Sequence, residues 1–424
     1  MTTPSSPQAS SLEASPPDLD QPLRLHPLTY LDEGEEVTVG RADIDSYGLF
    51  PPDGAALLRR LETGESPNAA ARWYREQYGE QVDMAEFIEV LEELELLVKA
   101  GEEIAVRTGP VRWQRLGRAV FSPVAWVLYG LLVAAAVAAM IRTPVLVPHY
   151  QNLFFTHGSL VVLTLGIFLG QAPWILMHEA AHALAGRRLG LNSTLAISRR
   201  FYYVVFETAL DGLVTVPRRK RYLPMLAGMI LDVLVVSALT LGAYALHGSA
   251  GAAGLIGRLM LSMAFTVILR IAWQFYFFLR TDLYFLAITV LGCNDLQATA
   301  RQVLRNRLMR ILRRPDKMVD PATFRDRDRQ VAEWYSWLMM AGYVVLTVIV
   351  LTTAIPSGIK VTEMAVHKLG SHLSPLNAAD VFTFLVLNFF EPVIAGYLAY
   401  RSWRKRRGSR GRTPSASGAT APTV

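Results

Sequence analysis

The stretch LVVLTLGIFLGQAPWILM (160–177) leads directly into HEAAH (178–182), and this junction decides both the fold and the chemistry of the chain. An apolar run of this length predicts a helix that crosses a membrane. If the helix continues, His178 and His182 lie on one face, where two imidazole nitrogens can share a zinc ion. Glu179 is then placed to take a proton from a zinc-activated water molecule. The motif predicts a zinc-dependent hydrolase site at membrane depth.

Chance is a poor explanation for this motif. With 8 histidines among 424 residues, a random HExxH is expected in on the order of one chain in a hundred. A glutamate between two histidines is also costly in hydrocarbon unless a bound ion balances its charge. The sequence therefore favours a metal site over a pair of structural histidines.

The composition predicts a polytopic membrane protein with one modest soluble part. Hydrophobic residues make up 52% of the chain and charged residues 18%, and the mean hydropathy is +0.27. The single cysteine, Cys293, excludes an internal disulfide framework and a cysteine-rich zinc site. The net charge of +6 comes from basic loops beside apolar segments. The lipid bilayer accounts for these loops, and we expect no nucleic-acid partner.

Six apolar segments are each long enough to cross about 30 Å of hydrocarbon. Arginine and lysine gather before the first segment, between the second and third, between the fourth and fifth, and after the sixth. Because positive charge marks the cytoplasmic side, both termini are expected in the cytoplasm. The predicted spans are 119–141, 158–186, 222–246, 255–280, 334–355 and 378–400.

The rest of the chain is predicted to form smaller parts. Residues 23–108 read as a small α+β module, with a strand at 37–39, helices capped by Asp53 and by Ser66 or Asn68, and a third helix over 84–98. Residues 191–217 favour a short sheet or hairpin at the cytoplasmic membrane face. We expect this organisation: a disordered tail (1–22), the cytoplasmic module (23–108), a membrane core of four spans (119–295), a basic amphipathic loop (296–333), two further spans (334–403) and a basic disordered tail (404–424).

A catalytic zinc needs a third protein ligand from elsewhere in the chain. The candidates are Asp232, Asp282, Glu207 and Asp211. Depth in the membrane favours Asp282, at the cytoplasmic end of the fourth span, although Asp232 stays within reach. Glu391 is a further ionisable group at membrane depth and so a functional candidate, with Arg270 as a candidate partner; the alternative, which we favour, is that both residues are structural.

The central part of the chain, roughly residues 158–295, resembles the site-2 protease class of intramembrane zinc metalloproteases. HEAAH (178–182) and RTDLYF (280–285) carry the resemblance. It implies that Asp282 is the third zinc ligand beside His178 and His182, although Leu283 stands where the family has glycine. AGM (227–229) with Asp232 is similar to the small-residue helix of the class, where asparagine is more usual. This likeness implies that Asp232 contacts substrate backbone or supports a metal ligand.

Residues 37–98 resemble the small winged-helix domains, similar to the PQQ-biosynthesis chaperone (PqqD-like), that bind leader peptides of ribosomally made natural products. PDGAALLRRLETG (52–64) and LELLV (94–98) carry this second resemblance. It implies that a leader peptide adds as a strand to an exposed sheet edge. A generic helical regulatory domain is the alternative.

Together these features predict a mainly α-helical bacterial cytoplasmic-membrane protein with a small α+β winged-helix-like domain at its N-terminus. We expect a zinc metalloendopeptidase that cleaves a membrane-associated or leader-bearing peptide and so matures a ribosomally synthesised peptide. Two alternatives remain: regulated proteolysis of a membrane-anchored signalling protein, and a non-catalytic metal-binding scaffold or export component.

Overall fold

The chain is mainly helical and divides into two compact units. The N-terminal unit contains residues 1–111 and 211–221, and the helical unit contains residues 112–210 and 222–424. The computed structural model describes residues 18–98 (without 35, 42 and 45), 102, 111–155, 160–200, 203–320, 324–356, 359, 362–363, 375, 378–386, 393, 397 and 400. The predicted tails, apart from residues 18–22, lie outside these residues.

The N-terminal unit packs three helices against a three-stranded antiparallel sheet of order β1-β2-β3. The strands are β1 (Thr29–Asp32), β2 (Val37–Arg41) and β3 (Ser46–Phe50), and the helices are α1 (Pro52–Glu62), α2 (Pro67–Tyr78) and α3 (Met84–Glu93). Val39, Leu57, Leu61 and Leu91 are fully buried in one core. A leucine stripe with helical spacing thus covers one face of the sheet.

The caps of these helices follow the sequence expectations only in part. Ser66 caps α2, and its Oγ accepts a hydrogen bond from the Ala69 N–H at 3.4 Å. Asp53 is not a cap, because α1 begins at Pro52 after Pro51. Its carboxylate instead accepts a hydrogen bond from the Tyr74 hydroxyl, and this hydrogen bond raises the pKa of Tyr74 to about 12.

The third helix ends earlier than predicted. It stops at Glu93 and does not continue to Val98, because Glu95 adopts a left-handed backbone with φ 55°. Leu97 then forms an isolated antiparallel bridge with Leu25. Strands β1 and β3 were not predicted, since their partners lie across turns that hydrophobic periodicity does not report.

Residues 211–221 belong to the N-terminal unit although they lie far along the chain. Both oxygens of the Glu33 carboxylate are engaged, at 2.9 Å from Arg218 Nε and 2.9 Å from Arg221 Nη2. These arginines open α7 (Arg218–Ala245), directly after the short helix η3 (Leu213–Thr215). Glu33 therefore holds the end of the segment that joins β5 to α7 against the N-terminal unit, to which this segment belongs.

The helical unit contains long helices in the regions of the predicted spans. Among the residues that the structure describes, four helices are long and apolar enough to cross a membrane: α5 (Pro123–Arg142), α7, α8 (Gly251–Trp273) and α11 with its continuation (Asp326–Thr352). Helix α6 (Leu160–Arg188) occupies the second predicted span. Of the sixth, 378–400, the structure describes residues 378–386 as helical and three later positions.

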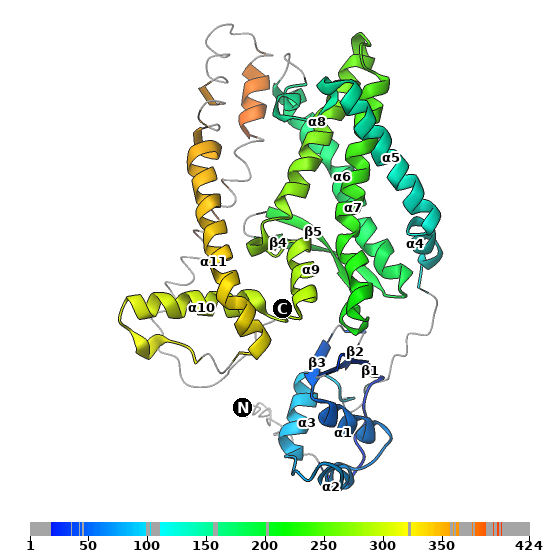
Figure 1. Ribbon diagram of the computed structural model, residues 1–424, viewed down its shortest axis with the longest axis vertical. Helices are drawn as coiled ribbons and strands as arrows, with labels where there is room; N and C mark the ends of the chain where they lie inside the picture. The colour runs from blue at the N-terminus through cyan, green and yellow to red at the C-terminus, as the bar shows by residue number, and fades with distance from the viewer. Residues whose placement is uncertain are drawn as a thin grey trace, which may run out of the picture. The chain divides into compact units, whose positions relative to one another are not determined.

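Figure 1 shows α6, α7 and α8 side by side, with α5 at the edge of this group. Apolar side chains join the three central helices, among them Trp174 from α6, Val235 from α7 and Val267 from α8. The hairpin predicted within 191–217 is present as β4 (Ser193–Arg200) paired antiparallel with β5 (Tyr203–Leu210). The short helices η1 (Pro144–Leu146) and η2 (Tyr150–Leu153) connect α5 to α6.

A second cluster of helices follows α8. It comprises η4 (Phe277–Leu279), α9 (Asp282–Leu291), α10 (Leu296–Ile311), η5 (Pro315–Lys317), α11 (Asp326–Ile349) and the π-helix η7 (Val350–Ala354). Leu296, Ala300, Ala332 and Met339 form its core. The predicted amphipathic segment in 296–333 is thus helical as α10.

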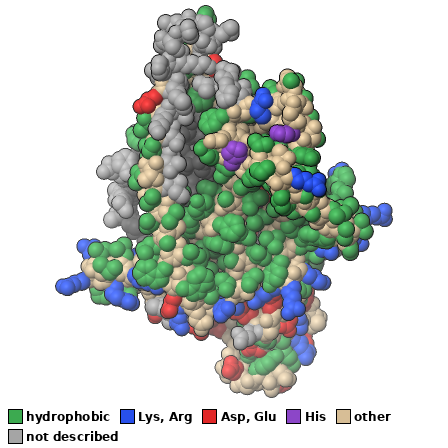
Figure 2. All heavy atoms as spheres, turned by 45° about the horizontal axis from the view of Figure 1, so that its top comes forward, with side chains coloured by type: hydrophobic (Ala, Val, Ile, Leu, Met, Phe, Trp, Pro, Cys, Tyr) green, Lys and Arg blue, Asp and Glu red, His purple; other side chains and the backbone are tan. Residues whose placement is uncertain are grey.

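The surface of the helical unit is unusually apolar for a protein in water. On α5, Val124 is 69% exposed and Leu131 61% exposed, and on α11 Trp334 and Trp337 are each more than half exposed. Figure 2 shows a broad field of hydrophobic side chains on one face, with lysine and arginine gathered at its margins. An apolar surface of this extent is stable against lipid and not against water.

Close backbone packing fixes α4 (Gln114–Val120) on α6. Gly117 is buried, and a Cβ at this position would overlap the carbonyl oxygen of Leu184. Gly130 in α5, by contrast, has open space where its Cβ would lie. The glycine in α4 thus permits two helices to approach more closely than any side chain would allow.

We predict that Gly117→Ala lowers the stability of the full-length protein by about 1–3 kcal/mol, because the new methyl group forces α4 from α6. Gly130→Ala is the matched control and should be neutral or stabilising by up to about 1 kcal/mol, since alanine favours a helix. Thermal unfolding of both variants in detergent micelles measures the difference. Equal changes in the two variants would contradict the packing role of Gly117.

Candidate metal centre

Helix α6 presents both motif histidines from one face. The four-residue spacing brings His178 Nε2 and His182 Nε2 to 3.2 Å from each other. Both residues are buried, at 5% and 8% exposure. The two Nε2 atoms therefore converge on one point inside the helical unit.

The outer nitrogen of each histidine faces a fixed acceptor. His178 Nδ1 lies 3.0 Å from Asp232 Oδ2, and His182 Nδ1 lies 2.7 Å from the carbonyl oxygen of Pro224. A carboxylate and a carbonyl can only accept, so both Nδ1 atoms donate. In the neutral imidazole, a proton on Nδ1 leaves a lone pair on Nε2, which is the form that binds a metal ion.

Asp282 completes the group from the start of α9. Its Oδ2 lies 3.2 Å from His178 Nε2 and 3.4 Å from His182 Nε2. Gln274 fixes the residue from two sides, because its Nε2 donates to Asp282 Oδ2 and its Oε1 accepts from the Asp282 N–H, each at 3.0 Å. The Gln274 carbonyl also accepts the Thr281 hydroxyl at 2.6 Å. Asp282 is thus held in place by residues outside the motif.

The three ligand atoms form a triangle with the dimensions of a metal site. Its edges are 3.2, 3.2 and 3.4 Å. Ligands of a tetrahedral zinc with bonds of about 2.0–2.1 Å lie about 3.3 Å apart. Two lone pairs and a carboxylate at such distances repel each other unless a proton or a metal cation lies between them. The donor set of two imidazoles and one carboxylate also matches that of catalytic zinc.

Gly228 keeps the space in front of this triangle open. A Cβ at position 228 would overlap both His178 Nε2 and His182 Nε2. The glycine lies on α7, one turn after Pro224, whose carbonyl holds His182. The residues therefore fit a metal ion in their donor chemistry, in their spacing and in the room that they leave.

Asp232 does not lie on the metal-facing side of the histidines. It is completely buried, and its carboxylate accepts hydrogen bonds from His178 Nδ1 and from the guanidinium of Arg270. Arg270 Nε lies 3.0 Å from Asp232 Oδ2. The paired arginine offsets the cost of a buried carboxylate among apolar helices. Asp232 therefore contacts His178, a candidate metal ligand, and Arg270 pairs with Asp232. Glu391, the partner considered for it from sequence, lies outside the described residues.

Glu179 directly follows His178 on α6, and its side chain reaches the β4–β5 hairpin. Its Oε2 accepts a hydrogen bond from the Thr208 hydroxyl on β5 at 2.9 Å. The side chain is half-buried and borders a pocket. The hairpin therefore fixes the direction of the carboxylate that follows the first histidine.

Among the described residues, the group that could hold a metal ion consists of His178, His182 and Asp282. Asp211 belongs to the N-terminal unit, and the side chain of Glu207 lies outside the described residues. Leu283, which stands where the family has glycine, is the second residue of α9, and the positive φ nearby belongs to Arg280. The local backbone therefore needs no glycine at position 283.

Sequence reasoning missed Gln274 and Thr208. Both are uncharged, and each meets its partner through folding, since Thr208 is 29 residues from Glu179 and Gln274 lies across a turn from Asp282. The one signal for Gln274 was an amide in an otherwise apolar segment at the end of the fourth predicted span.

Comparison with protein-family models, with curated proteins and with solved structures finds no match to the chain. The two family resemblances therefore rest on the motifs quoted above, and the argument for a metal rests on the geometry of these side chains.

We predict that Gly228→Ala weakens zinc binding by about 10–100-fold, the range seen when the surroundings of metal ligands are disturbed. The added methyl group would occupy the space at the two Nε2 atoms. Competition with a chromophoric chelator on the purified full-length protein measures the affinity, and Gly130→Ala is the control. Unchanged zinc affinity in Gly228→Ala would show that the ion does not bind at this triangle.

Asp232→Asn should also raise the zinc dissociation constant by about 10–100-fold, because His178 loses the carboxylate that fixes its tautomer. The single variant leaves Arg270 buried without its charge partner, which is strongly destabilising. The double variant Asp232→Asn with Arg270→Gln removes both charges and separates zinc affinity from folding. Ser237→Ala is the control, since Ser237 is buried on the same helix and bonds only to the Val233 carbonyl. Zinc affinity at the wild-type level in the double variant would refute the role of Asp232.

Proposed function

We propose that the chain is a membrane-embedded zinc metalloendopeptidase that hydrolyses a peptide bond in a membrane-associated substrate. The triangle of His178, His182 and Asp282, with edges of 3.2–3.4 Å, is the observation that carries this proposal. Two histidines from one helix and a carboxylate from another leave a fourth position for water or substrate. Bound there, Zn²⁺ would acidify water and polarise a carbonyl group.

Glu179 is the proposed general base. It accepts the proton of the attacking water and donates it to the leaving amine as the carbon–nitrogen bond breaks. The Thr208 hydroxyl orients its carboxylate at 2.9 Å, and the remaining oxygen is left for the water. Asp232 and the Pro224 carbonyl keep both imidazoles in the tautomer that presents Nε2.

The proposed membrane topology puts cleavage near the cytoplasmic surface. Six spans with both termini in the cytoplasm would place the basic residues around α10 and at the start of α7 on the side that retains positive charge. The proposed location is the cytoplasmic membrane of a bacterium. His178 and His182 precede Arg187 and Arg188 by about two turns of α6, which agrees with a site in the cytoplasmic third of the bilayer.

The N-terminal unit is the proposed recognition part. Its three-stranded sheet with helices on one face is compatible with the winged-helix-like resemblance, and β3 lies at one edge of the sheet. A leader peptide added there as a strand would deliver its precursor for cleavage, and this favours maturation of a ribosomally synthesised peptide. The alternative substrate is a membrane-anchored signalling protein, and a non-catalytic metal-binding scaffold is the alternative from another class.

Glu179→Gln separates the enzyme from the scaffold. We expect the variant to bind zinc like the wild type, because Glu179 is not part of the triangle, and to cleave at least about 10²–10⁴-fold more slowly. Zinc content is measured by elemental analysis, and cleavage by mass spectrometry of precursor peptides encoded beside the gene, in proteoliposomes. Equal processing by wild type and Glu179→Gln would overturn the protease assignment.

A further inference from the structure

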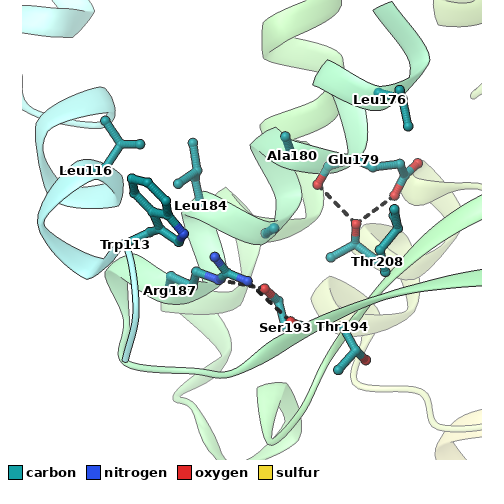
Figure 3. Close-up of a pocket in the computed structure, with 12 residues that line it drawn as sticks. Trp113, Leu116, Leu176, Glu179, Ala180, Leu184, Arg187, Ser193, Thr194 and Thr208 are labelled. Atoms are coloured by element: carbon teal, nitrogen blue, oxygen red, sulfur yellow. Dashed lines mark hydrogen bonds between the residues drawn. The ribbon is translucent and has the colours of Figure 1, made fainter. Parts of the chain in front are cut away.

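A pocket of about 390 Å³ lies beside Glu179 within the helical unit, and none of the three candidate metal ligands lines it. Its size falls in the range of small-ligand sites. One wall comes from α6, the opposite wall from Trp113 and Leu116 at the start of α4, and the rim from Ser193–Leu195 on β4 (Figure 3). Thr208 closes the end at which the Glu179 carboxylate is held.

The walls of this pocket are fixed by local structure. Gly117 lets α4 pack on the backbone of Leu184, and this close approach sets the distance between Leu116 and α6. Trp113, in a left-handed backbone with φ 67°, precedes the helix and lines the pocket with its ring. The pocket is therefore built between two helices in direct backbone contact.

The pocket offers mainly apolar surface to a ligand, and the two charged side chains that line it lie at its ends. Its lining is mainly leucine, alanine and tryptophan, and its exposed lining is largely apolar. Arg187 is engaged at the far end, where its Nε donates to Ser193 Oγ at 2.8 Å and its Nη2 reaches the Ser193 carbonyl. At the near end Glu179 accepts the Thr208 hydroxyl. A charged side chain held between these ends would lose its hydration against apolar walls.

We propose that this pocket receives a large uncharged side chain, aliphatic or aromatic, of the substrate residue next to the bond that is cut. The assignment rests on the proposed function, because it takes Glu179 as the base that acts at the cleaved bond. Glu179 directly follows His178 on α6, so a side chain bound beside its carboxylate would lie next to the proposed position of the reacting carbonyl. The pocket thus selects the substrate by the size and charge of a single residue.

A binding experiment tests the pocket without catalysis. Thr194→Cys in a Cys293→Ser background puts one thiol at the exposed mouth of the pocket. The full-length protein is treated with EDTA in nanodiscs, and maleimide labelling is followed with blocked pentapeptides of alanine that carry Phe, Leu, Ala or Asp at the centre. We expect the Phe and Leu peptides to slow labelling several-fold and the Ala and Asp peptides to leave the rate unchanged.

A pair of variants, one with a bulky side chain inside the pocket and one with the same side chain outside it, provides the control. Ala183→Phe narrows it from α6 and should abolish protection by the Phe peptide, whereas Ala138→Phe on the exposed side of α5 should not. The proposal is overturned if no peptide protects, if the Asp peptide protects as well as the Phe peptide, or if Ala183→Phe leaves protection intact.

Cleavage of transmembrane peptides that vary at one central residue, by zinc-loaded protein, distinguishes the two proposals. Cuts should fall beside Phe or Leu, and Ala183→Phe should shift them at least tenfold toward Ala. Protection without any cleavage would remove the proposed hydrolysis and leave the binding pocket standing. Cleavage without preference for apolar residues would keep the hydrolysis and remove the pocket.

Discussion

Two imidazole nitrogens and one carboxylate oxygen meet among apolar helices, and the rest of the candidate site is arranged around them. Each imidazole has its Nδ1 hydrogen committed, one to Asp232 and one to the Pro224 carbonyl. The Nε2 lone pairs and the Asp282 carboxylate then face one another with little water to screen them. A positive ion at the centre is the simplest way to stabilise this geometry. The buried carboxylate of Asp232 would help to bind such an ion by orienting His178, and Gly228 would leave room for the ion.

The same need for charge balance explains the buried pair of Asp232 and Arg270, which lies behind His178. A carboxylate without exposure in a bundle of apolar helices needs a cation at hydrogen-bonding distance, and Arg270 on α8 supplies it. The pair also joins α7 to α8 beside the histidines of α6. The same groups that orient the ligand therefore hold together the three helices that carry the site.

The sequence predicted the local parts of this arrangement well and the distant parts poorly. The spacing of His178 and His182 is local information, because one helix fixes their geometry, and the long apolar segments predicted long helices for the same reason. Asp282 lies 104 residues from His178, and residue types alone left it beside three other acids. Gln274 and Thr208 carry no charge that could mark them, and their roles exist only after the chain has folded. The early end of α3 and the displaced cap of α1 have the same origin, since a left-handed Glu95 and the Tyr74 hydroxyl both act through contacts that periodicity does not encode.

Because residues 211–221 belong to the N-terminal unit, the role of that unit cannot be tested simply by deleting the N-terminal residues. The segment is the covalent link between β5, which carries Thr208, and α7, which carries Pro224, Gly228 and Asp232. Glu33 binds the two arginines at its end. A truncation that deletes the N-terminal residues would therefore also remove the carboxylate that pairs with Arg218 and Arg221. These two arginines lie at the start of α7, the helix that carries Pro224, Gly228 and Asp232. Loss of activity in such a shortened chain would be ambiguous between missing substrate recognition and a loosened scaffold. Neutralising Glu33 alone, with the domain retained, is the cleaner dissection.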